Sequence, residues 1–377
     1  MQKIGIGLVG YGGIGRLHAY CYKSLPFLYD MPVDIELIGI ATSSPLSAQR
    51  AASQTNAIFS TTDYNELISR DDIHLIDICT PNNLHADIIC AADKAGKHIY
   101  CEKPLTVNFD EANRIKGEMA FSDRIFQMAF QYRFSPAILR ARQLVGEGFL
   151  GDILSFQVGY YHSGYLGTDR PMSWRLRKSE GGGGALFDLG SHAIDLLYYI
   201  TDQRTKRLLA KSRVLTPDRQ EKDGRWTKVD VDDDITIMLE LESGALGTLE
   251  ASRIATGSYD DLDILIRGSK GALSWHLMDP NWLEVYDATK PGKPMGGIRG
   301  WQKIEAIQNY PSPAAIPPGK ATLGWSRLHA ASQFNVIENI LTGKSTGPGW
   351  EDAFYNQRFL EAAIQSAEQD RWIDIEK

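Results

Sequence analysis

The chain has 377 residues, of which 43% are hydrophobic, and this length is enough for about two domains with separate cores. Its 40 Lys and Arg residues against 47 Asp and Glu give a net charge of −7 without a long run of one sign, so nucleic acid is not expected as a partner. No window approaches the roughly 18 apolar residues of a membrane span, and the first residues lack the pattern of a signal peptide. We therefore expect a cytoplasmic protein with no membrane partner.

The first 126 residues alternate between strand-like and helix-like segments. Strand patterns occupy residues 3–10, 35–42, 74–80 and 98–103, and helix patterns occupy residues 13–24, 46–55 and 84–97. Strands that alternate with helices predict a parallel, doubly wound sheet. We therefore expect a Rossmann domain of the α/β class at residues 1–126.

The rest of the chain changes to the alternating apolar and polar pattern of antiparallel strands. Three segments show it, each with a glycine-containing turn: 153–164, 236–253 and 262–277. Helices are expected at 136–145 and about 185–200, and the Pro- and Gly-rich residues 288–320 are expected to form a long surface loop. Residues 127–345 are thus predicted to be an α+β domain on a large, open-faced antiparallel sheet.

The cysteine pattern argues against disulfides and against a metal centre. The four cysteines stand in apolar or helical contexts without CxxC spacing: Cys21, Cys79, Cys90 and Cys101. Such cysteines are typical of free, buried thiols. We therefore expect no metal.

A glycine-rich turn separates the first strand from the first helix. It reads Gly10-x-Gly12-x-x-Gly15, a weak motif on its own in a chain with 35 glycines. Here it follows a strand and opens a helix at the start of a βαβ unit, which is the context that a dinucleotide-binding fingerprint requires. The residues expected to bind the pyrophosphate of this cofactor are Gly10, Gly12, Gly13, Ile14 and Gly15.

The residues after the second strand favour NADP slightly over NAD. An acidic residue normally stands there to hold the ribose hydroxyls of NAD, whereas this chain has Thr42, Ser43 and Ser44. Three hydroxyl side chains do not repel a 2′-phosphate as a carboxylate would. No arginine follows immediately, so the expected preference is small.

A run of four glycines, residues 181–184, leads into a helical pattern that carries Asp188, His192 and Asp195. Asp188 and His192 are four residues apart, so a helix places both on one face. One interpretation is a solvated helix surface with an ordinary ion pair. The glycine run and the apolar flanks indicate instead a helix face that points into a cleft.

Five motifs in order along nearly the whole chain resemble one family of enzymes. They are GYGGIGRLHA, CTPNNLHADI, AGKHIYCEKPL, WRLRKSEGGGGALFDLGSHAIDL and GWEDAFYNQRFLEAAIQSAEQDRWI. The chain resembles the family of glucose–fructose oxidoreductase, inositol dehydrogenase and MocA-type relatives. The resemblance implies that residues 127–345 bind the substrate and that residues 346–377 form a C-terminal helix that packs back on the Rossmann domain.

The resemblance also implies the catalytic residues. In this family the lysine of a Glu-Lys-Pro motif lies at the end of a Rossmann strand beside the nicotinamide, and an Asp and a His four residues apart come from the second domain. The matching residues are Lys103, Asp188 and His192. The proline that follows the lysine restricts Lys103 to extended or turn geometry.

Each of these side chains suits one part of a hydride transfer. His192 is expected to be the general base in oxidation and the general acid in reduction, because imidazole titrates near neutral pH. Lys103 is expected to hydrogen-bond the reacting oxygen and stabilise its negative charge. Asp188 is expected to orient the base and hold the neighbouring substrate hydroxyl.

Other matches imply further cofactor and substrate contacts. Those to the cofactor are Thr80, Pro81, Asn82, His85 and, with a structural role equally open, Glu102. Trp174 and Arg175 are expected to frame a sugar, although core packing explains Trp174 equally well. Structural roles are expected for Tyr160, Tyr161, Tyr165, Trp275, Trp282, His98 and His162.

The resemblance implies an NAD(P)-dependent oxidoreductase that acts on a secondary hydroxyl of a cyclic polyol, sugar or sugar derivative. Two alternatives stay open: an NAD-dependent glycosidase of the same fold, and a ligand-sensing regulator. The presence of Lys103, Asp188 and His192 argues against the regulator. Because one face of the antiparallel sheet is expected to be uncovered in a single chain, we also expect a homodimer or homotetramer through that face.

Overall fold

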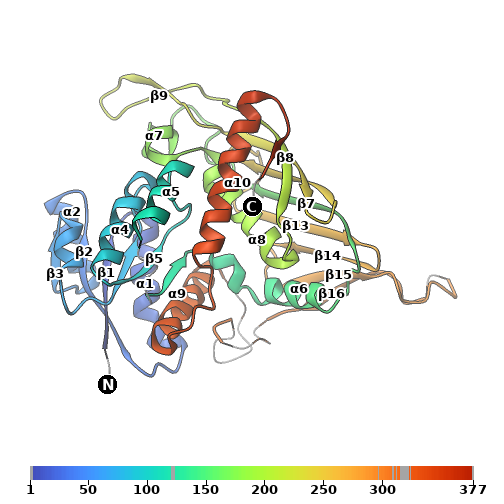
Figure 1. Ribbon diagram of the computed structural model, residues 1–377, viewed down its shortest axis with the longest axis horizontal. Helices are drawn as coiled ribbons and strands as arrows, with labels where there is room; N and C mark the ends of the chain where they lie inside the picture. Colours follow the sequence, from blue (N-terminus) through green and yellow to red (C-terminus); the bar gives the residue numbers. More distant parts are fainter. Residues whose placement is uncertain are drawn as a thin grey trace. The chain divides into compact units, whose positions relative to one another are not determined.

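The computed structural model describes residues 3–119, 124–295, 297–307, 310, 312–314, 322 and 324–375. It divides into two compact units, each with its own main sheet (Figure 1). The first unit comprises Met1–Gln131, Ser312–Pro318 and Gly324–Phe354. The second comprises Tyr132–Pro311, Gly319–Leu323 and Tyr355–Lys377.

The first unit contains a six-stranded parallel sheet in the order β3-β2-β1-β4-β5-β6. Its strands are β1 (Lys3–Val9), β2 (Asp34–Ala41), β3 (Phe59–Thr61), β4 (Leu75–Ile78), β5 (His98–Cys101) and β6 (Phe126–Met128). This order is that of a Rossmann sheet, in which ligands bind at the carboxyl ends of the strands where the order reverses, here between β1 and β4. The predicted Rossmann fold is confirmed.

Helices cover both faces of this sheet (Figure 1). They are α1 (Gly13–Leu28), α2 (Pro45–Thr55), α3 (Tyr64–Ile68), α4 (His85–Lys94), α5 (Phe109–Glu118) and α9 (Trp325–Thr342), with a short 3₁₀ turn, η1 (Asn82–Leu84). Ile4, Ile6 and Leu8 of β1 pack in one core cluster with apolar residues of α1 and α9, whereas Val9 packs in a second cluster with residues of α4 and α5. The sequence analysis did not predict β3, α3 and β6, which are too short to show a period. It did not predict the longer helices α5 and α9 either.

Two C-terminal segments differ from the predicted division of the chain. The residues of α9 fall within the predicted second domain, but the helix packs against α1 in the first unit, where Phe334 stacks on Tyr29 with ring centroids 3.9 Å apart. Helix α10 (Trp350–Gln369) begins in the first unit, where Trp350 stacks on Phe126, and continues in the second. There the Ser366 hydroxyl accepts a hydrogen bond from the backbone N–H of Ala210 at 2.9 Å. The other predicted domain limits stay predictions.

The second unit is built on a nine-stranded sheet in the order β16-β15-β14-β13-β7-β12-β11-β8-β17. Its strands are β7 (Ile153–Tyr161), β8 (Thr205–Arg213), β11 (Asp234–Leu241), β12 (Leu246–Ser252), β13 (Asp261–Gly268), β14 (Gly271–His276), β15 (Trp282–Asp287), β16 (Trp301–Glu305) and β17 (Ile373–Asp374). The sheet is antiparallel except that β7 and β12 pair in parallel, so the predicted antiparallel sheet is a mixed, mostly antiparallel one. A separate ribbon pairs β9 (Asp218–Gln220) with β10 (Trp226–Lys228).

The second unit also contains helices, some of which pack against the large sheet. They are η2 (Gln131–Phe134, which begins in the first unit), α6 (Pro136–Gly146), η3 (Trp174–Leu176), α7 (Lys178–Gly181), the π-helical turn η4 (Leu186–Gly190) and α8 (Ser191–Thr201). Of these, α6 contacts β14 and β15, and α8 contacts β7 and β12. The apolar residues Ile235, Ile237 and Leu239 of β11 are fully buried.

The predicted surface loop at 288–320 is wrong in part. Residues 301–305 form β16, which pairs with β15 and sets Trp301 against Tyr286. Trp301 and Ile304 are of residue types that favour strands, so a strand forms here despite the flanking Pro and Gly residues. Residues 288–295 and 297–300 join the two strands and extend away from the sheet (Figure 1), while much of 308–320 lies outside the described residues.

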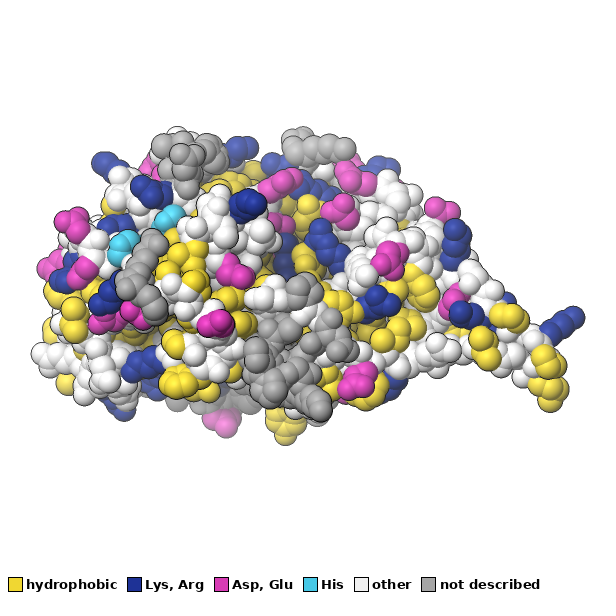
Figure 2. Space-filling view, turned by 90° about the horizontal axis from the view of Figure 1, so that it is seen from below, with side chains coloured by type: hydrophobic (Ala, Val, Ile, Leu, Met, Phe, Trp, Pro, Cys, Tyr) yellow, Lys and Arg dark blue, Asp and Glu magenta, His cyan; other side chains and the backbone are white. Residues whose placement is uncertain are grey.

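No helix in the described part of the chain is long and apolar enough to cross a membrane. On the face drawn in Figure 2, basic and acidic side chains lie interspersed among hydrophobic ones. The four cysteines are free thiols, and three of them are buried: Cys21, Cys79 and Cys101.

Candidate functional site

The glycine turn brings the backbone of β1 directly against the end of β4. Gly10 has a φ of +97°, and a Cβ there would lie 2.4 Å from the carbonyl oxygen of Cys79. A Cβ at Gly15 would lie 2.2 Å from the carbonyl oxygen of Gly10. Only glycine fits at these two positions, because any side chain would push β1, α1 and β4 apart.

The start of α1 has the properties of an anion site. Its N-cap is Gly12, which provides no side-chain cap, and no acidic residue lies in its first turn. A Cβ at Gly12 or at Gly13 would meet no atom within 4 Å, so both face open space. Backbone N–H groups at an open, uncapped helix N-terminus fit the pyrophosphate of a dinucleotide.

The hydroxyls at the end of β2 bond to one another within their own turn. Thr42 Oγ1 donates to the carbonyl oxygen of Ser44 at 3.1 Å and lies 2.5 Å from Ser47 Oγ. Ser44 Oγ caps α2 by accepting from the backbone N–H of Ser47. Ser43 is exposed and lies between these two residues. No carboxylate stands in this turn, as the sequence showed.

The segment after β4 and the Glu-Lys-Pro segment after β5 lie at the same edge of the sheet. Ile78 pairs with Cys101, and the backbone N–H of Glu102 donates to the carbonyl oxygen of Ile78 at 2.9 Å. His85 ties the two segments together, since its Nδ1 lies 3.0 Å from the Pro104 carbonyl oxygen and its Nε2 lies 3.2 Å from that of Thr80. Burial lowers the pKa of His85, so the imidazole is neutral and donates to one of these carbonyls at a time.

The turn after β4 also holds a buried hydroxyl whose partner is missing. Thr80 Oγ1 is shielded from solvent and makes no hydrogen bond to the described residues. Asn82 is buried in η1, which follows Pro81. A ligand at the switch point can supply the hydrogen-bond partner that the Thr80 hydroxyl lacks. The residues of this turn that were predicted to bind the cofactor therefore suit a dinucleotide.

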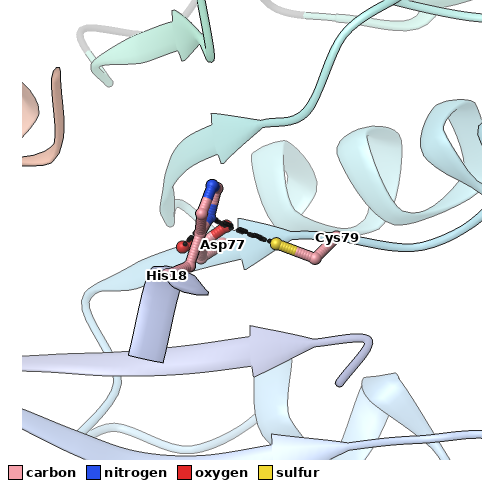
Figure 3. Close-up of side chains that lie close together, drawn as sticks. All are labelled: His18, Asp77 and Cys79. Atoms are coloured by element: carbon pink, nitrogen blue, oxygen red, sulfur yellow. Dashed lines mark hydrogen bonds and ion pairs between the residues drawn. The ribbon is translucent and has the colours of Figure 1, made fainter. Parts of the chain in front are cut away.

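A cluster of ionisable side chains is buried beside these segments, and the sequence analysis did not find it (Figure 3). His18 of α1 places its Nδ1 3.0 Å from both carboxylate oxygens of Asp77 in β4 and 3.2 Å from Cys79 Sγ. Its Nε2 lies 3.0 Å from Glu102 Oε1, an ion-pair contact outside hydrogen-bond alignment. These residue types can bind metals, but their direct contacts with one another already account for them.

In the second unit, Asp188 and His192 stand on consecutive helical segments. Asp188 lies in η4 and His192 in the first turn of α8. Asp188 Oδ2 lies 3.1 Å from Nη2 of Arg253, which is itself buried. The Nη1 of Arg253 also donates to the carbonyl oxygen of Arg175 at 3.2 Å. Arg253 thus links Asp188 to the segment that was predicted to frame the substrate.

The side chains of Trp174 and Arg175 are partly exposed, with the Arg175 guanidinium 4.3 Å from the Trp174 ring centroid. They are therefore not simple core residues. Lys103 belongs to the first unit and the other predicted catalytic residues to the second.

The glycine run before Asp188 has a steric cause. A Cβ at Gly184 would lie 1.7 Å from the carbonyl oxygen of Asp232. The Asp232 carboxylate accepts from the backbone N–H groups of Gly184 and Leu186, both at 2.8 Å. This carboxylate caps the start of the π-helical turn and so fixes where Asp188 stands.

Two tyrosines that sequence reasoning treated as structural or left out lie against His192. The ring centroid of Tyr132 is 4.9 Å from that of His192, and that of Tyr160 is 6.0 Å from it. The Tyr132 and Tyr160 hydroxyls are 2.7 Å apart, and Tyr160 donates to Asp260 Oδ1 at 2.7 Å. His162 Nε2 lies 3.1 Å from the same oxygen, in a half-exposed position.

This arrangement forms a hydrogen-bonded chain from beside the buried imidazole to the partly exposed Asp260. No sequence signal could pair Tyr160 with Asp260, because they are 100 residues apart.

Comparisons with known proteins agree with the fold of both units. Residues 4–130 match the family model described as "Oxidoreductase family, NAD-binding Rossmann fold", and residues 138–274 match "GFO/IDH/MocA C-terminal domain". Levoglucosan dehydrogenase from Pseudarthrobacter phenanthrenivorans is 30% identical over 393 residues, which cover 100% of this chain and 99% of that protein. Myo-inositol 2-dehydrogenase from Thermotoga maritima is 28% identical over 268 residues, or 71% of this chain and 74% of that protein.

Solved structures show the same likeness over the full length. The structure titled "Levoglucosan dehydrogenase, complex with NADH and L-sorbose" has a TM-score of 0.91 at 30% identity and covers 100% of both chains. An oxidoreductase domain protein from Kribbella flavida has a TM-score of 0.92 at 32% identity, again with 100% of both chains covered.

Gly12→Ala should leave the fold intact and weaken dinucleotide binding. The new methyl group meets no protein atom within 4 Å, but it would occupy the open space at the helix N-terminus. We expect a melting temperature within about 2 °C of the wild type and a Kd for NADH, measured by fluorescence titration, at least about tenfold higher. Gly117→Ala, equally unhindered in α5, is the control. Equal NADH affinity in both variants would contradict the site.

Proposed function

The chain belongs to the Gfo/Idh/MocA family of oxidoreductases, and from that premise we propose that it is an NAD(P)-dependent dehydrogenase for a secondary hydroxyl of a cyclic polyol, sugar or sugar derivative. The observation that carries the proposal is the open, uncapped start of α1 at the Rossmann switch point, beside the Glu-Lys-Pro segment. Full-length relatives named for levoglucosan and inositol support a sugar or cyclic polyol as the substrate.

We propose that three residues carry the chemistry. When bound, the nicotinamide supplies the hydride acceptor. His192 takes the proton of the substrate hydroxyl, and Lys103 hydrogen-bonds the same oxygen as negative charge develops on it. Asp188, held by Arg253, orients the base and the neighbouring hydroxyl. Trp174 and Arg175 contact the sugar beside them.

The tyrosine chain offers the proton on His192 a route to solvent. Because Tyr160 donates to Asp260, its oxygen is left to accept from Tyr132, so both hydroxyls point their protons toward the carboxylate. Burial, first of all, and the nearby Asp260 raise the pKa of Tyr160, which therefore keeps its proton in the resting enzyme. A chain of this polarity passes a proton outward without forming a free tyrosinate.

The choice of cofactor is a finer part of the proposal. The family is NAD-binding, and the relative of known structure was solved with NADH. No carboxylate stands at the end of β2, so a 2′-phosphate is not repelled there. We therefore still predict a slight preference for NADP. Thr42 and Ser44 already form hydrogen bonds within their own turn, and a 2′-phosphate would have to replace these bonds. The binding free energy that the phosphate contributes is therefore small.

A homodimer or homotetramer through the large sheet is also part of the proposal. Met238 of β11 and Leu246 of β12 lie on the sheet face opposite Ile237 and are 48% and 51% exposed. Large apolar residues side by side on an uncovered sheet face favour a partner there. A second copy of the chain is the proposed partner, and the cytoplasm is the proposed compartment.

Lys103→Ala should lower kcat by roughly 10²-fold and leave the Kd for NADH within about tenfold, as expected for one electrostatic group lost from the transition state. His192→Ala should behave likewise. The assay is a panel of polyols, aldoses and their keto forms with NAD and NADP. Lys94→Ala, an exposed lysine at the end of α4, is the matched control. Near-normal turnover by the Lys103 variant would remove that residue from the mechanism.

Thr42→Asp should shift the cofactor preference toward NAD. The new carboxylate repels the 2′-phosphate and offers an acceptor to the ribose hydroxyls, each such contact being worth about 1.5–3 kcal/mol. The measurement is kcat/KM with each cofactor before and after the change. Ser53→Asp adds the same charge on the exposed side of α2 as a control. A wild-type kcat/KM that is at least a hundredfold higher with NAD than with NADP would show that these hydroxyls do not bind the 2′-phosphate.

Met238→Arg should dissociate the oligomer. A buried, unpaired guanidinium in each copy of the interface is costly, so we expect a smaller mass by light scattering at equal protein concentration. Phe27→Arg, at an exposed hydrophobic position of α1, is the control for added charge. A wild-type chain that is monomeric at about 100 μM would refute the sheet as an interface.

A further inference from the structure

The buried imidazole of His18 stands between two carboxylates that come from different strands. Asp77 lies in β4 and contacts the Nδ1 side, while Glu102 directly follows β5 and contacts the Nε2 side, each at 3.0 Å. The side chains of His18 and Asp77 have no solvent exposure at all. Two buried anions of this kind need a cation between them.

The surroundings give the imidazole a positive charge. Burial alone would lower the pKa of His18, but the charge of Asp77 and its hydrogen bond raise that pKa well above the usual value. Burial, with the charges of His18 and Lys103, lowers the pKa of the neighbouring His329, which stays neutral. One cation therefore faces two anions in this cluster.

The other titratable groups around His18 add no charge near neutral pH. Burial is the main cause that raises the pKa of each one: Cys21 and Tyr22 on α1, Cys79 after β4, and Tyr100 on β5. All four groups stay protonated and neutral. The charge balance of the cluster thus rests on His18, Asp77 and Glu102.

We infer that His18 is a positioning residue: bridged between Asp77 and Glu102, its imidazole fixes the Glu102 side chain and with it the adjoining backbone that aims Lys103. The inference rests on the proposed role of Lys103 in the reaction. Helix α1 then has two roles. Its N-terminus follows the glycine-rich turn, and His18, further along the helix, holds the segment that contains Glu102 and Lys103.

Removing the cation should disturb this segment in a specific way. In His18→Gln a single amide nitrogen replaces the two ring nitrogens that face Asp77 and Glu102, and the side chain carries no charge. The two carboxylates lose their shared partner, and the Glu102 side chain is no longer held. Lys103 follows it because the two residues are joined through the backbone.

The test compares His18→Gln with Tyr100→Phe. Tyr100 lies 5.5 Å from His18 between ring centroids, and its hydroxyl donates to Ser332, so the control removes a buried hydrogen bond from the same neighbourhood without changing charge. We expect kcat of His18→Gln to fall by about 10- to 100-fold with KM for the sugar within about threefold. The control should differ from the wild type by less than about threefold in both.

A second measurement does not depend on activity. In cofactor-free protein, the rate at which an amine-reactive reagent labels Lys103, followed by mass spectrometry, reports the position and surroundings of that amine. We expect His18→Gln to change this rate by at least about threefold and Tyr100→Phe to leave it unchanged. If the wild-type protein oxidises no sugar or polyol, the proposed function fails while this measurement still decides the inference.

The double variant His18→Gln/Glu102→Gln provides a rescue. It removes the anion that the lost cation had balanced, so its kcat should be no lower than that of His18→Gln. The loss of kcat in the double variant should therefore be smaller than the combined losses of the two single variants.

Three results would overturn the inference. One is a labelling rate and kcat in His18→Gln equal to those of the control. Another is a loss of kcat in the double variant that equals the combined losses of the two single variants. The third is a stoichiometric metal ion in the wild type that is lost in His18→Gln, which would make these side chains ligands. If His18→Gln does not fold, Glu102→Gln alone must change the labelling of Lys103, or the inference fails.

Discussion

The close approach of the β1 backbone to the end of β4 is the constraint on which the first unit depends. Gly10 and Gly15 leave no room for a Cβ, and this lets α1 begin directly at the switch point of the sheet. The direction of α1 then follows, with open N–H groups at its start and His18 further along, against Asp77. The open glycine turn and the contact of α1 with Asp77 therefore both depend on one backbone contact.

Buried charges play the corresponding part in the second unit. Arg253 reaches Asp188 and the carbonyl oxygen of Arg175, and Asp232 caps the π-helical turn that carries Asp188. A buried charge is tolerated only where partners satisfy it, so each of these residues can occupy one arrangement. Asp188, one of the candidate catalytic side chains, is in this way held both by Arg253 and by the capped turn that carries it.

In both units, a residue of the candidate site or its neighbour contacts a side chain from a distant part of the chain. His18 contacts Glu102, the neighbour of Lys103, in the first unit, and Arg253 contacts Asp188 in the second. Positioning of this sort is what lets a donor or a base act without reorganising at the moment of reaction. It also explains why polar residues are buried near the proposed site.

The sequence by itself determined the parts whose physical cause is local. The turn from Gly10 to Gly15 needs only a strand, a helix and glycines between them, and Lys103 is placed by the strand before it and the proline after it. Only the tertiary structure decided the rest. Tyr160 meets Asp260 across 100 residues, Asp188 meets Arg253 across 65, and His18 meets Asp77 across 59. The parallel pairing of β7 with β12 and the return of α9 to α1 are also long-range. No period or motif records such contacts, because they depend on which strands and helices become neighbours after the chain has folded.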